Sequence, residues 1–166
     1  MIADKRWTQF KITADLNIPV RAVYEAWTTS GGLESWFLRE ADFFTSAGRK
    51  RAPGEFIAKT DRYEWRWHGW PDDVKEHGQI LEANGKDFIK FSFSGDSIVS
   101  VYINKRSDMT MIDLVQENIP LEKDPSKSLF VGCQNAWLFY LANLKSIYQG
   151  GIDLRNKQVD VMSSFK

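Results

Sequence analysis

Residues 126–151 read SKSLFVGCQNAWLFYLANLKSIYQGG, and this stretch decides the fold. Ser126 or Ser128 can cap the amino end of a helix, because a serine oxygen accepts hydrogen bonds from the first free amides. Gly150-Gly151 supplies the stop. Apolar residues recur between these ends at spacings of three and four: Phe130, Cys133, Trp137, Tyr140, Leu141, Leu144, Ile147 and Tyr148. That spacing marks one face of a helix and predicts a long amphipathic C-terminal helix.

Upstream of this helix, apolar and polar residues alternate with a period of two, as they do in strands. Strands are predicted at 7–17, 41–45, 55–60, 63–70, 77–82, 87–93, 98–104 and 109–118. Asn84-Gly85 is a strong hairpin signal. Two short helices are expected after the first strand, one beginning at Pro19 and one over residues 33–38. Because parallel strands would need crossovers of a dozen residues or more, the short turns predict an antiparallel meander.

Length and composition indicate one globular domain. The chain has 166 residues, of which 43% are hydrophobic, and no repeat or linker divides it. We expect the domain to span residues 1–157, with a polar C-terminal tail at 158–166 and fraying from Ile152. No apolar run approaches the roughly 20 residues that a membrane helix needs. Residues 1–10 lack the apolar core of a signal peptide, so we expect a cytoplasmic protein.

Charge and cysteine content narrow the classes of partner. Lys plus Arg and Asp plus Glu each total 22, so the net charge is zero and no concentrated basic face for nucleic acid is indicated. We expect neither nucleic acid nor a membrane as partner, and either a monomer or a homodimer. The single Cys133 cannot form an internal disulfide. With two histidines and no Cys cluster, the sequence predicts no metal site and no cofactor.

Two stretches carry a resemblance to a known family. Residues 33–37 read LESWF and residues 136–145 read AWLFYLANLK. With the order of elements, they resemble a stand-alone member of the activator of heat-shock protein 90 ATPase homologue-like proteins, within the START-like superfamily. The likeness covers about residues 10–157. In the terminal helix Trp137 keeps the family's position, although Ala136 stands where the family usually has glycine.

The resemblance implies an α+β helix-grip fold. In that fold a curved antiparallel sheet of about six to seven strands wraps around the long C-terminal helix. Two short helices follow the first strand, and a cavity lies between the sheet and the C-terminal helix. The family shares no catalytic residues that could be carried over to this chain, so the resemblance implies a cavity and not a reaction.

Aromatic residues make up 14% of the chain, including seven Trp. Large rings either fill a core at native density or wall a cavity for an apolar ligand. The candidate ligand-binding residues on the faces predicted to point inward are Trp36, Phe37, Trp65, Trp67, Phe91, Phe93, Gln116, Trp137 and Leu141. We expect Trp65, Trp67 and Trp137 to contact the ligand. Trp36 and Phe37 follow a Gly-rich turn and are expected near the entrance.

The other chemistry-bearing residues favour structural roles, and no catalytic residue is predicted. Gln116 lies on an apolar face, so either a ligand or a neighbouring side chain must hydrogen-bond its amide. His68 falls on the polar face of its predicted strand, and both it and His77 are expected at the surface. Cys133 is expected to pack as an inert hydrophobe. The basic run 49–51 is expected in a solvated loop.

Three functions are compatible with these observations. The leading hypothesis is a module that binds a small hydrophobic molecule. The second is a chaperone-associated interaction protein, which would need an exposed apolar or charged patch. The third is a cyclase- or hydrolase-like enzyme, which would need an inward acid, base or nucleophile, and the only inward polar candidates are Gln116, Tyr63, Tyr140 and Tyr148. The sequence favours an enzyme least, because it places no nucleophile beside a base.

Overall fold

A curved antiparallel sheet wraps around one long helix in the computed structural model, which describes residues 5–158. Seven strands are found in that range: β1 (Phe10–Leu16), β2 (Glu40–Phe44), β3 (Arg62–Arg66), β4 (Lys75–Ala83), β5 (Phe88–Phe93), β6 (Ser97–Arg106) and β7 (Met109–Glu117). Their order in the sheet is β1-β7-β6-β5-β4-β3-β2. Sequence neighbours therefore pair with each other except at β1, which returns to pair with β7. The predicted meander is confirmed.

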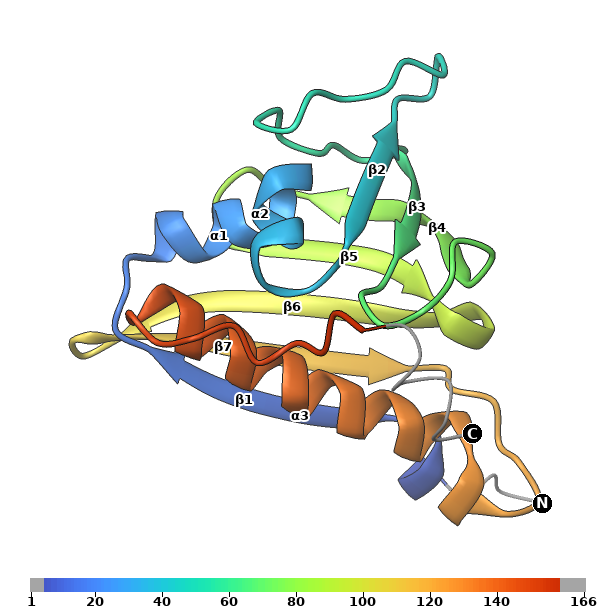
Figure 1. Cartoon of the computed structure of the whole chain (residues 1–166). Coiled ribbons are helices and arrows are strands. Elements are labelled where there is room, and N and C mark those ends of the chain that lie inside the picture. The colour runs from blue at the N-terminus through green and yellow to red at the C-terminus, as the bar shows by residue number, and fades with distance from the viewer. Residues whose placement is uncertain (1–4, 159–166) are drawn as a thin grey trace.

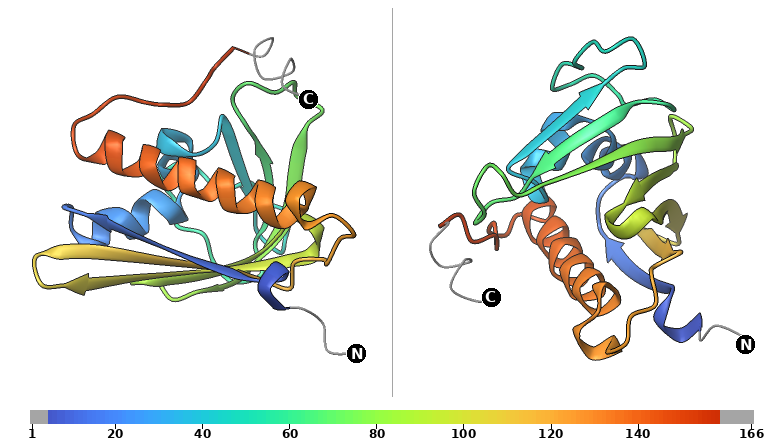
Figure 2. Two further views of the ribbon diagram at one scale, coloured as in Figure 1. Left: turned by 90° about the horizontal axis from the view of Figure 1, so that it is seen from below. Right: turned by 90° about the vertical axis from the view of Figure 1, so that its right-hand side faces the viewer.

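Three α-helices accompany the sheet: α1 (Val20–Thr28), α2 (Ser30–Trp36) and α3 (Leu129–Tyr148). Single 3-10 turns lie at Lys5–Trp7 (η1), Ser94–Asp96 (η2) and Pro125–Lys127 (η3). Ser128 caps α3, because its Oγ accepts a hydrogen bond from the amide of Val131. Figure 2 shows the sheet curving around α3. The predicted α+β helix-grip fold is confirmed.

The interior beneath α1, α2 and α3 is built from aromatic rings in contact. The Trp27 and Trp36 ring centroids lie 4.7 Å apart, and those of Phe37 and Trp137 lie 5.0 Å apart. All four side chains are buried. The Trp36 indole N–H donates to the backbone oxygen of Ala26 at 2.9 Å, which ties α2 to α1. The two short helices therefore enter the core through their rings and close one end of the sheet.

The structure corrects the prediction of a strand at residues 55–60. This segment belongs to an irregular connection between β2 and β3. Its amide at Ile57 donates to the Thr28 oxygen at 2.9 Å, which holds the segment to α1, and Thr60 at its end donates to the Ile80 oxygen of β4 at 2.9 Å. Arg51 forms ion pairs with Glu55 and with the buried Asp61. These ion pairs hold the connection in place. An alternating pattern of polar and apolar residues does not predict such ion pairs.

The prediction that the basic run 49–51 is solvated holds for Arg49 and Lys50, whose side chains are each 60% exposed, but not for Arg51. Arg49 pairs with Glu55 at 2.7 Å and Lys50 pairs with Asp42 at 3.1 Å. The Arg51 side chain is only 14% exposed. Because each cation already has a carboxylate partner, this loop offers no concentrated free charge to a phosphate.

Candidate ligand-binding pocket

A pocket of about 660 Å³ lies beside α3. Three segments supply most of its lining: α3 itself, the connection 67–74 between β3 and β4, and the C-terminal segment 154–156; Phe37, Phe93 and Ser94 complete it. Its lining residues are Phe37, Trp67, His68, Trp70, Val74, Phe93, Ser94, Leu129, Gly132, Cys133, Asn135, Ala136, Trp137, Phe139, Tyr140, Leu154, Arg155 and Asn156. The lining is therefore mostly apolar, with a few polar groups placed among the rings.

Gln116 and Trp137 form a hydrogen-bonded chain behind the pocket. The Trp137 indole N–H donates to the Gln116 Oε1 at 2.9 Å, and Gln116 Nε2 donates to Ser97 Oγ at 2.9 Å. Neighbouring side chains thus serve the buried Gln116 amide. A buried amide left unpaired would cost about 1–3 kcal/mol, so this chain holds the Trp137 ring in one orientation.

The nine candidate residues divide into two groups. Four line the pocket: Phe37, Trp67, Phe93 and Trp137. The other five are buried and absent from its lining: Trp36, Trp65, Phe91, Gln116 and Leu141. Alternation along a strand predicts which side chains point inward, but it does not separate a packed interior from a hollow. Trp65, for example, stacks on Tyr63 at 3.8 Å between ring centroids.

The structure corrects the expectation that His68 lies at the surface. Strand β3 ends at Arg66, so the alternation that assigned His68 to the polar face does not extend to it. The side chain is half-buried on the pocket wall and forms no hydrogen bond with any described residue. Burial lowers the pKa of the imidazole, and the nearby Arg155 lowers it further. His77 is exposed, as predicted.

Tyr140 brings a second polar group into the pocket from α3. Its ring packs edge-on against Phe37, with 4.9 Å between the centroids. The hydroxyl has no hydrogen-bond partner among the described residues. Burial raises the pKa of the phenol to about 12, so the hydroxyl keeps its proton and acts as a donor. The helical pattern places Tyr140 on the inward stripe, but it does not indicate an unpaired hydroxyl.

Cys133 lines the pocket one turn into α3 and is buried. Burial raises the pKa of its thiol, and the carboxylate of Glu76 on β4 raises it further. Glu76 in turn accepts a hydrogen bond from the pocket residue Ser94 at 3.1 Å. Because the thiolate is the reactive form of cysteine, this environment keeps Cys133 unreactive.

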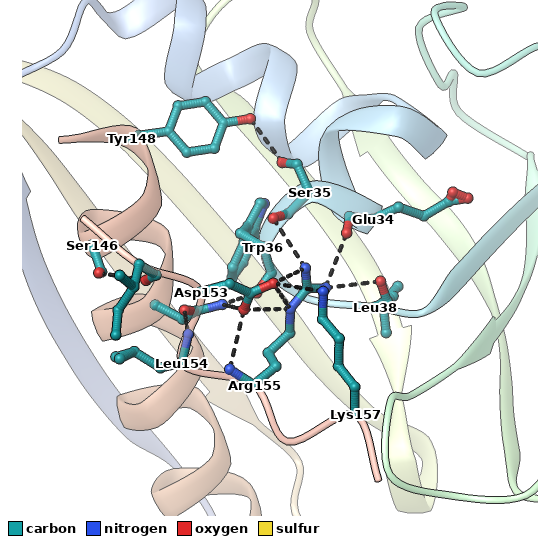
Figure 3. Close-up of polar contacts among 12 residues, drawn as sticks. Glu34, Ser35, Trp36, Leu38, Ser146, Tyr148, Asp153, Leu154, Arg155 and Lys157 are labelled. Carbon is teal, nitrogen blue, oxygen red and sulfur yellow. Dashed lines mark hydrogen bonds and ion pairs between the residues drawn. The ribbon is translucent and has the colours of Figure 1, made fainter. Parts of the chain in front are cut away.

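The third wall is a C-terminal strap, residues 153–158, that runs back from the end of α3 (Figures 1 and 3). Asn143 on α3 donates to the Trp36 oxygen at 2.7 Å and accepts from the Leu154 amide at 2.6 Å. The fraying expected after Ile152 is therefore wrong for residues 153–155. Of the predicted tail 158–166, all but Gln158 lies outside the described residues.

Arg155 anchors this strap with all of its donors (Figure 3). Its Nη1 donates to the backbone oxygens of Glu34 and Leu38, at 2.9 and 3.0 Å. Its Nη2 donates to the Ser35 oxygen at 3.1 Å and to Asp153 at 2.8 Å, and Nε also donates to Asp153. The side chain is 5% exposed. A guanidinium has five N–H groups, so Arg155 is fully used in tying the strap to the end of α2.

Two kinds of site are absent from the described residues. Over residues 5–158, no group of three or more His, Cys, Asp or Glu side chains is placed to hold a metal ion. In the same range, no helix has the length and apolar character needed to cross a membrane.

Comparison with known proteins identifies a family and a shared fold. The model of the family described as Activator of Hsp90 ATPase homolog 1-like protein matches residues 17–149. No curated protein matches the sequence significantly.

Three solved structures illustrate the shared fold. A protein from Staphylococcus saprophyticus has a TM-score of 0.69 and 12% identity, covering 91% of this chain and 98% of its own. The Aha1 dimer from Colwellia psychrerythraea has a TM-score of 0.66 and 14% identity, covering 86% and 97%. An HSP90 activator from Plasmodium falciparum has a TM-score of 0.61 and 17% identity, covering 86% and 96%. At these identities the likeness is one of fold.

Proposed function

Because the chain belongs to the family of Activator of Hsp90 ATPase homolog 1-like proteins, we propose that its fold serves to bind a small hydrophobic molecule in the pocket beside α3. The pocket itself carries the proposal. Its volume of about 660 Å³ lies within the range of small-molecule sites, roughly 300–1,000 Å³. Its lining combines large rings with a small number of polar groups, which is the usual composition of such sites.

Binding is favoured over catalysis by the state of the titratable groups in the lining. Covalent catalysis needs a nucleophile activated by an adjacent base or by a lowered pKa. The pKa of Cys133 is raised, and so is that of Tyr140, which leaves both groups protonated. His68 reopens the question of a general base, but no hydrogen bond joins it to a nucleophile among the described residues. The lining therefore supports a receptor better than an enzyme.

The test is to place a large side chain in the pocket and to measure how tightly an apolar fluorescent probe then binds. A Cβ atom built at Gly132 meets nothing within 4 Å, so Gly132→Phe can place its ring in the pocket without a clash at the backbone. Ala142→Phe, on an exposed position of α3 outside the lining, is the matched control. Binding of the uncharged fluorophore N-phenylnaphthylamine is measured by its increase in emission.

We expect saturable binding by the unmodified protein and by Ala142→Phe, and at least tenfold weaker binding by Gly132→Phe. Circular dichroism checks that each variant is folded. An unmodified protein that gives no saturable signal with the probe would contradict the proposal, and so would equal binding by both phenylalanine variants.

A chaperone partner is the second candidate, and the outer side of α3 favours it. Leu138 is 51% exposed on that side, beside Phe139, which is 41% exposed and also borders the pocket, and Lys145 is the single charged residue in the helix. An exposed apolar patch of this kind can mark a protein-binding surface. Leu138→Glu places a charge there without altering the pocket lining. If Hsp90 is a partner, this variant should bind purified Hsp90 more weakly than the unmodified protein while keeping its affinity for the probe.

A further inference from the structure

The two ends of the pocket differ in charge. At the Cys133 end the nearby charged group is the carboxylate of Glu76, which also bonds Ser94. At the Tyr140 end the nearby charge is Arg155, which acts on the phenol. Tyr140 lies seven positions after Cys133 on α3, which corresponds to about 10 Å along the helix axis at 1.5 Å per residue. The pocket therefore runs from an acidic end to a basic end.

His68 belongs to the basic end. The charges that act on its imidazole are the cations Arg155, Lys157 and Arg39, against the single carboxylate of Asp153. Arg39 is itself paired with Asp72 at 2.6 Å. Lys157 lies 3.3 Å from Asp153 and its side chain is 57% exposed. The local balance is positive, so a negative group is favoured at this end over a positive one.

Arg155 is the obvious anchor for a carboxylate, but its donors are already engaged. All five of its N–H groups point to Glu34, Ser35, Leu38 and Asp153. To bind a ligand it would have to release part of the strap. Its role is therefore to contribute charge and to hold the wall, and the direct contact must come from another residue.

Two side chains at this end retain free hydrogen-bonding capacity. The Tyr140 hydroxyl and the His68 imidazole both face the pocket and both lack a partner among the described residues. A protonated phenol donates one hydrogen bond, and a neutral imidazole also has one N–H to donate. Two donors in a positive setting suit an acceptor that carries negative charge.

Building on the proposed function, we propose that the pocket selects an elongated amphipathic carboxylate. Its carboxylate accepts hydrogen bonds from Tyr140 and His68. Its apolar body extends along α3 toward Cys133, past the rings of Phe37 and Trp137. The carboxylate of Glu76 at the far end disfavours the reversed orientation.

The experiment compares three compounds that share one chain and differ in the polar group. Dodecanoate, dodecanol and dodecylamine each compete with N-phenylnaphthylamine for the pocket at neutral pH. We expect dodecanoate to compete at least tenfold better than dodecanol, because hydrogen bonds to a charged group contribute more than neutral ones. Dodecylamine should be the weakest competitor.

Two single substitutions then test which residues cause the preference for dodecanoate. Tyr140→Phe removes only the hydroxyl, and His68→Gln keeps a polar side chain without the ring. On each variant, the preference for dodecanoate over dodecanol, measured as the ratio of their competition constants, should fall about tenfold. The matched controls are Tyr102→Phe and His77→Gln, at exposed positions on the sheet outside the pocket. Both controls should keep the preference for dodecanoate.

The outcomes separate this inference from the proposed function. If the probe does not bind at all, the proposed function fails. If the probe binds and the three competitors are equal, the pocket exists but the selection of a carboxylate is wrong. If dodecanoate is preferred and both Tyr140→Phe and His68→Gln retain that preference, the assignment to these two residues is overturned. Circular dichroism checks that each variant is folded, independently of its affinity for the probe.

Discussion

Gly78 on β4 and Gly132 on α3 lie in two regions of the molecule that differ in packing: Gly78 faces the packed core, and Gly132 is exposed on the pocket lining. A Cβ atom built at Gly78 would lie 2.3 Å from Cε2 of Tyr63, well inside van der Waals contact. A Cβ atom built at Gly132 meets nothing within 4 Å. Aromatic side chains line both regions: Tyr63 lies beside Gly78, and Phe37 and Trp137 line the pocket that Gly132 borders. An aromatic-rich composition thus produces a filled core in one place and a hollow in another.

The difference comes from how the walls are made. In the filled region the rings of Tyr63, Trp65 and Phe91 come from paired strands, and their backbones are held by the ladder at fixed spacing. In the open region the walls come from the connection 67–74 and the strap 153–158, which have no regular pairing with α3. The strap is held to α3 by Asn143, which bonds Asp153 and Leu154. It is held to α2 and Leu38 by the side chain of Arg155.

The largest expected effect therefore comes from removing the contact that holds the open region's wall. Arg155→Met removes the guanidinium donors to three backbone oxygens and to Asp153, which keeps Asn143 and Lys157 as partners. We expect a loss of about 3 kcal/mol in the free energy of unfolding, measured by urea denaturation. The control Lys157→Met removes a largely exposed cation from the same strap and should cost no more than about 0.5 kcal/mol. Equal costs would show that the strap is not held by Arg155.

The filled region should resist any added atom. Gly78→Ala is expected to cost about 2 kcal/mol, because the new methyl group must displace the buried Tyr63 ring. Tyr63 cannot move freely, since its hydroxyl donates to the Ser92 oxygen at 2.7 Å. Thermal or urea unfolding measures the cost. The double variant Gly78→Ala with Tyr63→Leu should recover part of it, and no recovery would point to a different clash.

Comparing two buried tryptophans separates the contribution of an indole hydrogen bond to stability from the contribution of burying the ring. Trp137 donates to Gln116, whereas the buried Trp65 Nε1 has no acceptor among the described residues. Replacement by Phe removes a similar volume at both sites, but only Trp137→Phe leaves a buried acceptor unpaired. We expect Trp137→Phe to cost about 1–2 kcal/mol more than Trp65→Phe in urea unfolding. A reversed order would contradict the hydrogen-bonded chain behind the pocket.

Acid should loosen the strap before the filled core. The hydrogen bonds from Arg155 lower the pKa of Asp153, so the folded protein holds this carboxylate ionised more strongly than the unfolded chain does. Its contribution is complete above the unfolded pKa of about 4 and is lost as the pH falls below it. Asp153→Asn should therefore destabilise the protein by about 1 kcal/mol at pH 7 and by less at pH 3. An effect that grows on acidification would refute this linkage.

The smallest effect is expected at the open glycine. Gly132→Ala should stabilise the protein by about 0.5–1 kcal/mol, because alanine is the better helix former and its methyl group meets no atom. The same substitution reduces the pocket only slightly, so binding of the apolar probe should persist. Destabilisation in urea would mean that the space beside Gly132 is already filled in solution.

Much of the fold could be predicted because it rests on local periodicity. The spacing of Trp137 and Leu141 predicts the long helix, and Asn84-Gly85 predicts the turn between β4 and β5. The candidate site is harder to predict. The alternation of side chains along β5 assigns both Phe91 and Phe93 to the inward face, but only Phe93 lines the pocket. His68 escapes the pattern altogether, because it follows the last paired residue of its strand.

Taken alone, the amino-acid sequence determined the class of fold, the order of its elements and an aromatic interior, since each depends on patterns within a few residues along the chain. The tertiary structure decided where that interior stays open. Arg155 is 117 positions or more from the backbone oxygens that it binds on α2 and beyond, and Tyr140 and His68 meet in one pocket from separate elements. No local pattern encodes such contacts, because they depend on the packing of distant segments against one another.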